Sequence, residues 1–104
     1  MKEWAAFMDK YYPEGNKADQ STLYGYGVAK GLVEVLKQCG DELTRENVMK
    51  QAANLNFEIG IYLPGMRIKT SPTDYQPLQQ LQMMKFQGET WNLFGPLIDG
   101  SLDN

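Results

Sequence analysis

Residues 21–40 read STLYGYGVAKGLVEVLKQCG, and the fold prediction starts from this stretch. Its apolar residues recur at spacings of three and four, which is typical of an amphipathic helix. Ser21 or Thr22 is a suitable N-cap and Gly40 a suitable C-terminal stop, so we predict a helix over residues 22–38. The apolar side of this helix consists of Val28, Ala29, Leu32, Val33, Val35, Leu36 and Cys39. Because the charged residues lie on the opposite side, we expect this broad face to be buried.

Three glycines interrupt the same helix. Gly25, Gly27 and Gly31 each weaken it by about 1 kcal/mol relative to alanine, which indicates that another group comes close. Close packing of a neighbouring helix is one explanation. The approach of a ligand near Gly25 is the other.

The flanking segments predict two more helices. Apolar residues at helical spacing indicate a helix over residues 3–12, which Pro13 would end. Thr44 is a suitable N-cap for a third helix over residues 44–55.

Beyond Phe57 the pattern changes from helical spacing to alternation. Apolar residues at every second position predict a strand over residues 59–63 and, after Pro64-Gly65, a short strand over residues 66–70. Residues 70–74 are rich in turn formers and indicate a crossing between structural units.

A hairpin is predicted at the end of the chain. Two strand-like runs, residues 78–86 and 90–94, flank Gln87-Gly88-Glu89, in which the glycine would take a positive φ. Trp91 is expected to pair across the hairpin with Met83 or Lys85. The tail from residue 99 to residue 104 is expected to fray.

Length and composition restrict the function classes. The chain has 104 residues, 42% of them hydrophobic and 22% charged, which is enough for one globular domain. A net charge of −3 and scattered lysines argue against nucleic acid as a partner.

The residue types needed for most catalysis are missing. The chain has no histidine and one cysteine, Cys39, so it lacks the commonest general base and a plausible zinc ligand set. Cys39 is interpreted as a core residue, with a reactive thiol as the alternative. Asp41 and Glu42 are adjacent and do not converge on one substrate. We therefore predict no enzyme activity, no catalytic residue, no cofactor and no metal.

Polar and aromatic residues gather at the start of the long helix: Ser21, Thr22, Tyr24 and Tyr26. Helix N-termini present unpaired amides and a partial positive charge, which suits a carboxylate ligand. The alternative is a capped helix start with two packed tyrosines.

Four stretches together resemble a known family: residues 24–40, 43–48, 63–75 and 86–95. In order and spacing they are similar to the C-terminal third of branched-chain amino-acid-type (type I) periplasmic solute-binding proteins of ABC transporters. The resemblance implies a fragment of an α/β fold that in isolation would be α+β, with three helices followed by short strands and a C-terminal β-hairpin. It also implies that residues 1–68 belong to a first lobe, residues 69–77 to a hinge crossover, and residues 78–104 to a second lobe with the hairpin and tail.

The resemblance also implies a function. The parent protein would be an extracytoplasmic receptor that binds amino acids or similar small carboxylates and delivers them to an ABC permease. Ser21, Thr22 and Tyr24 would face the ligand cleft. The part of the family that supplies most ligand-holding groups is not in this sequence, so we do not expect the 104-residue chain to bind ligand alone.

Localisation and assembly depend on whether the chain is a receptor fragment or a free-standing protein. No apolar run resembles a signal peptide or a membrane span, so the chain is either part of a longer periplasmic protein or, if Met1 is the true start, cytoplasmic. The alternative function is a free-standing interaction module that oligomerises. Unpaired strand edges and apolar helix faces predict a homodimer or a strand-exchanged assembly.

Overall fold

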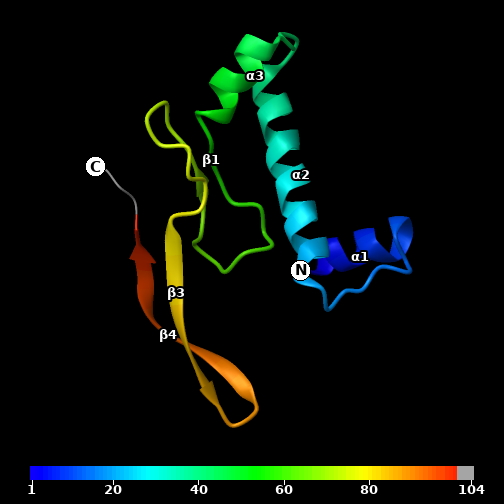
Figure 1. Cartoon of the computed structure of the whole chain (residues 1–104), viewed down its shortest axis with the longest axis vertical. Helices are drawn as coiled ribbons and strands as arrows, with labels where there is room; N and C mark the ends of the chain where they lie inside the picture. The colour runs from blue at the N-terminus through cyan, green and yellow to red at the C-terminus, as the bar shows by residue number, and fades with distance from the viewer. Residues whose placement is uncertain (101–104) are drawn as a thin grey trace.

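The computed structural model describes residues 1–100 of the chain. It is a small α+β structure with three helices and two small antiparallel sheets (Figure 1). In chain order the elements are α1 (Lys2–Tyr11), α2 (Gln20–Cys39), α3 (Arg45–Ala52), β1 (Asn56–Phe57), β2 (Ile68–Lys69), β3 (Gln80–Gln87) and β4 (Thr90–Asp99). The α+β class predicted for the isolated chain is confirmed.

The long central helix forms where the sequence predicts it, but a different residue caps it. Asp19 is the N-cap, and its carboxylate accepts a hydrogen bond of 2.8 Å from the amide of Ser21. The prediction of Ser21 or Thr22 as the cap is therefore wrong, because an acidic side chain two residues earlier reaches the first free amide. Gly40, with φ of 60°, ends the helix as expected.

The two shorter helices also lie near their predicted positions. Thr44 caps α3, accepting a 3.1 Å hydrogen bond from the amide of Asn47. This helix ends at Ala52, three residues earlier than the predicted end at residue 55. The hydroxyl of Thr70 donates to the carbonyl of Ala52 (2.7 Å) and accepts from the amide of Leu55 (2.9 Å), which turns the chain toward β1.

The strand predicted over residues 59–63 is wrong. The strand in this region is instead β1, which pairs in antiparallel fashion with β2, while residues 58–67 form a loop between them. Gly60, inside the predicted strand, has φ of 79°, which interrupts the extended backbone there. Ile59 and Ile61 are nevertheless buried, so the alternation of apolar residues indicated buried positions and not a strand.

The hairpin is confirmed, with Gly88 at φ of 67° in its turn. Gln87 pairs with Thr90 across the turn, and this register places Trp91 opposite Phe86. The predicted pairing of Trp91 with Met83 or Lys85 is therefore wrong. β4 continues to Asp99 past a register shift, which makes it longer than the predicted run. The last four residues of the tail expected to fray lie outside the described residues.

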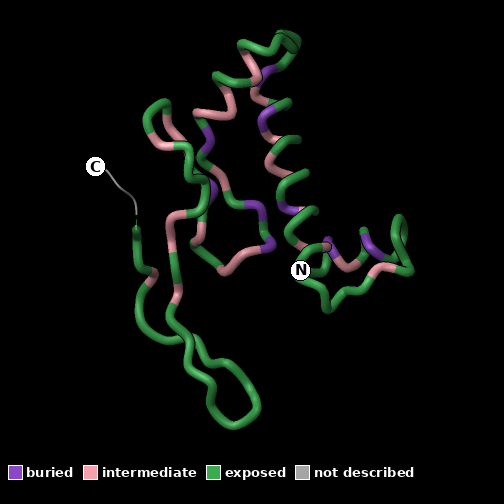
Figure 2. The backbone as a smooth tube through the Cα atoms, in the orientation of Figure 1, coloured by how far each residue is buried: buried purple, intermediate pink, exposed green. Residues whose placement is uncertain are grey.

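In the described part of the chain, the buried core lies entirely before the hairpin. Figure 2 shows the buried positions along the helices and the loop that faces them, and none along β3 and β4. The buried side chains are Trp4, Met8, Val35, Cys39, Leu55, Ile59, Ile61 and Ile68. Cys39 is thus a buried core residue, as interpreted from the sequence.

The molecule is open and flat. Its extents are 51 × 40 × 17 Å and its radius of gyration is 16.1 Å, whereas a compact domain of this length has a radius of about 13 Å. The hairpin extends away from the helices, and α1 crosses near the N-terminal end of α2 (Figure 1). Much of the apolar surface is consequently left uncovered.

The largest departure from expectation concerns the apolar face of α2. Of the seven residues predicted to be buried there, only Val35 and Cys39 are buried in the described structure. α3 covers the C-terminal part of one side, while α1 and the loop pack on another side that carries Lys30. The amphipathic pattern was read correctly, but no described element covers most of its apolar side.

Candidate functional site

The three predicted ligand residues lie together at the N-terminal end of α2. Ser21 and Tyr24 are exposed, and Thr22 is half-buried. The hydroxyl of Thr22 donates to the carbonyl of Asp19 at 2.8 Å. The structure therefore gathers these side chains at one helix end, with the hydroxyl of Thr22 already engaged in the local turn.

The amides at this helix end are partly occupied. The carboxylate of Asp19 accepts from the amide of Ser21, and the amide of Thr22 donates to the carbonyl of Asp19 at 3.2 Å. A ligand carboxylate at this point would meet a carboxylate of the same sign. This geometry favours the hydroxyls of Ser21 and Tyr24, rather than the helix amides, as the groups that could contact a polar ligand.

Tyr26, the fourth member of the predicted cluster, turns away from the other three. Its hydroxyl donates to Glu3 at 3.1 Å, and its ring lies 5.1 Å from that of Phe7. Burial first, and then the hydrogen bond to Glu3, raise the pKa of Tyr26. This tyrosine packs α1 against α2 and does not line the candidate site.

Glu3 also accepts a hydrogen bond from the ammonium of Lys30, at 2.9 Å. This bond is the main reason that the pKa of Glu3 is lowered, with the hydroxyl of Tyr26 contributing next. The same bond raises the pKa of Lys30. The arrangement joins α1 to α2 through one carboxylate.

Tyr62 is the site residue that the sequence did not reveal. The loop of residues 58–67 brings its hydroxyl to 3.4 Å from the position that a Cβ on Gly27 would occupy. Burial raises the pKa of Tyr62, and the nearby phenol of Tyr24 raises it further. Tyr62, from the loop, and Tyr24, from the helix, therefore both lie beside the N-terminal half of α2. The alternating pattern of residues 59–63 was the available signal, but it did not show which side of the loop would meet the helix.

Only one of the three helix glycines is closely approached. A Cβ on Gly27 would lie 2.8 Å from Cδ1 of Ile61, whereas Gly25 and Gly31 have nothing within 4 Å of that position. Close packing is thus the reason for glycine at position 27. The open space beside Gly25 has no occupant among the described residues.

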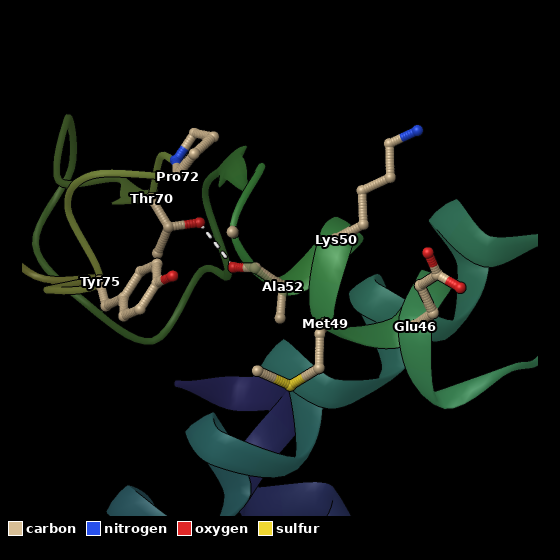
Figure 3. A pocket seen from close by; sticks show the side chains of 8 residues that line it. Glu46, Met49, Lys50, Ala52, Thr70, Pro72 and Tyr75 are labelled. Carbon is tan, nitrogen blue, oxygen red and sulfur yellow. Dashed lines mark hydrogen bonds between the residues drawn. The ribbon is translucent and has the colours of Figure 1, made fainter.

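A separate cavity of about 510 Å³ opens between α3 and the segment that follows β2 (Figure 3). Its walls are mostly apolar, and the hydroxyl of Thr70 is directed at the carbonyl of Ala52. The lining residues are Glu46, Met49, Lys50, Ala52, Ala53, Thr70, Pro72 and Tyr75. The cavity has few polar groups to orient a ligand, and sequence reasoning assigned no role to it.

Two observations concern metal ions and membranes. Residues 1–100 contain no group of three or more side chains of metal-binding type gathered at one place. Within the same range, no helix is both long and apolar enough to cross a bilayer.

Comparisons with known proteins return no relative: no family model, no curated protein and no solved structure matches this chain.

Proposed function

We propose that this chain is part of an extracytoplasmic solute receptor that binds amino acids or similar small carboxylates for import by an ABC transporter. It supplies helices to a first lobe, a crossover, and a hairpin to a second lobe. The observation that carries the proposal is the division of the structure. Within residues 1–100 every buried side chain lies at or before Ile68, and the hairpin after residue 79 contributes none. A segment that links two lobes, each with its own hydrophobic core, would have this organisation.

The contacts of the connecting segment support this role. Residues 69–77 form a turn with its own hydrogen bonds, from the amide of Lys69 to the carbonyl of Pro77 (2.9 Å) and in both directions between Ser71 and Asp74 (2.9 and 3.1 Å). At its start, the amide of Thr70 donates to the carbonyl of Leu55. The segment is therefore attached to the helical part and leads away from it, as a crossover between lobes would.

Binding requires more surface than this chain provides. Ser21 and Tyr24 are exposed, so the described residues leave both side chains largely open to solvent. A receptor that closes around its ligand needs two surfaces that move about a hinge. We therefore expect the 104-residue chain to bind none of these ligands by itself.

The first experiment measures the mass of the native protein. An antibody against this chain, applied to an osmotic-shock extract of the source cells, should detect a species of about three times the 11.8 kDa of the chain. A native species of 11.8 kDa that remains inside the cell would contradict the proposal.

The second experiment tests the site in that native species. A thermal-shift screen with amino acids and small carboxylates should identify a stabilising ligand, and Tyr24→Ala should weaken its binding at least about tenfold, since a buried tyrosine contact contributes more than 1 kcal/mol. Tyr11→Ala is the matched control, because Tyr11 lies on α1 outside the site and the two tyrosines, Tyr24 and Tyr11, are 68% and 64% exposed in this chain. Equal effects of the two substitutions would remove Tyr24 from the site.

One observation favours a second candidate, a free-standing module that acts by self-association. The exposed apolar side of α2 is a surface that soluble proteins usually cover. This candidate predicts that the 11.8 kDa form is the native one.

A further inference from the structure

The exposed side of α2 forms a continuous uncharged stripe. Six residues at spacings of three and four follow one side of the helix over about 16 Å. They are Gly25, Val28, Ala29, Leu32, Val33 and Leu36. Their Cα positions lie on regular helix, and all except Gly25 are apolar side chains that are exposed in the described structure.

Charges border this stripe without entering it. Lys30 is turned toward α1, where it bonds to Glu3, and Glu34 is half-buried on the packed side. The first charged residue at the C-terminal end of the stripe is Lys37. An uncharged, apolar patch of this kind has the composition of an interface core.

The chain as a whole exposes more surface than a compact monomer does. The chain exposes 8010 Å², whereas a compact monomer of its mass exposes about 5,900 Å². The excess of about 2,000 Å² is more than twice the roughly 800 Å² that each partner buries in a standard interface. This excess belongs to the whole chain, including the exposed hairpin, and the stripe is one of the surfaces that contribute to it.

We propose that two copies of this chain pair through α2 in an antiparallel arrangement, with the two-fold axis level with the midpoint between Lys30 and Gly31. This register matches large residues with small ones. Leu36 of one copy lies opposite Gly25 of the other, and Leu32 lies opposite Ala29. The stripe is thus complementary to itself, which a symmetric dimer interface requires.

Gly25 supplies the space that the register needs. Nothing lies within 4 Å of the position that a Cβ on this residue would occupy, so a leucine from a second copy can approach the helix backbone there. The pairing explains why a residue unfavourable to helices stands at an open position of α2. It requires only this chain and does not depend on the receptor assignment.

The first test measures the mass of the 104-residue chain in solution as a function of concentration. Wild type is expected at twice 11.8 kDa. Leu32→Glu should raise the dissociation constant at least about 100-fold, because it buries an unpaired charge in the centre of the stripe. Leu43→Glu is the matched control and should leave the dimer intact, because this leucine is 64% exposed, against 54% for Leu32, and lies outside α2. Circular dichroism checks that the variants keep their helices.

The second test examines the register and remains informative if Leu32→Glu fails to fold. Gly25→Leu alone should weaken the dimer, because two leucines would compete for one space. Adding Leu36→Ala exchanges the large and small positions and should restore the dimer. A wild-type chain that stays monomeric at its highest soluble concentration would overturn the proposal. So would a dimer that tolerates both Leu32→Glu and Gly25→Leu, because it would have to form through the hairpin edges or another surface.

Discussion

At the scale of single residues, Gly27 is the most closely approached of the three glycines in α2. A Cβ there would overlap Cδ1 of buried Ile61 at 2.8 Å. Gly31 lies one helical turn away with nothing within 4 Å. We expect Gly31→Ala to stabilise the fold by up to about 1 kcal/mol through helix propensity. In Gly27→Ala the same gain is offset by overpacking of about 1–3 kcal/mol. Urea denaturation of both variants measures the difference, and Gly27→Ala equal to or more stable than Gly31→Ala would show that Ile61 yields at no cost.

The hydrogen bonds of Glu3 make the stability of the fold depend on pH. Its pKa is lowered from 4.5, first by the hydrogen bond from Lys30 and then by that from Tyr26. A carboxyl group with a lowered pKa stabilises the fold above its unfolded pKa, and this contribution disappears as the pH falls through the folded value. Glu3→Gln should therefore lower the melting temperature slightly at pH 7, and this difference from wild type should vanish in the acidic range below 4.5. The matched control is Glu89→Gln in the hairpin turn. A difference for Glu3→Gln that persists unchanged in acid would exclude the ionic contribution.

At the scale of elements, Thr70 fastens the end of α3 to the strand that follows the loop. Its half-buried hydroxyl donates to the carbonyl of Ala52 and accepts from the amide of Leu55. Thr70→Val keeps the shape but leaves both backbone groups without this partner, and we expect a loss of about 1–3 kcal/mol in the free energy of unfolding. Thr73→Val is the control, because Thr73 is an exposed residue of the same segment and its hydroxyl contacts the hydroxyl of Ser71 within the turn (3.4 Å). Similar losses in the two variants would argue against the fastening role.

Among these elements, the helix ends were predictable from local sequence, whereas the loop that packs on α2 was not. Thr44 and Gly40 act through hydrogen bonds and backbone angles within a few residues, so the start of α3 and the end of α2 were predicted closely. The strand expected over residues 59–63 failed because positive φ at Gly60 depends on how the whole loop folds over α2. The candidate site divides in the same way. Ser21 and Thr22 follow from the helix start, whereas Tyr62 reaches Gly27 through a contact across 35 residues of sequence.

At the scale of the whole molecule, a sequence pattern can identify an apolar face without identifying what covers it. The stripe on α2 was predicted as apolar and expected to be buried, and it is exposed. Periodicity reports the side of a helix that avoids water, but the covering group can belong to another element, another copy or another chain. For this chain the covering group is not among the described elements. Under the receptor proposal the rest of the parent protein would cover this face, whereas under the dimer proposal a second copy covers it.

The division between the helical part and the hairpin leads to a test that compares one substitution at two places. Ile61 is 8% exposed in the core beneath α2, and Ile98 is 45% exposed on β4. Ile61→Ala should cost about 2–5 kcal/mol, because it leaves a cavity in the core that the helices share. Ile98→Ala should change the unfolding of the helices by no more than about 0.5 kcal/mol, because the hairpin contributes no buried side chain to them. The helical circular dichroism signal followed in urea reports on the helices in both variants. An equal loss for Ile98→Ala would mean that the hairpin packs on the helical part in solution, and the chain could then not serve as a link between two lobes.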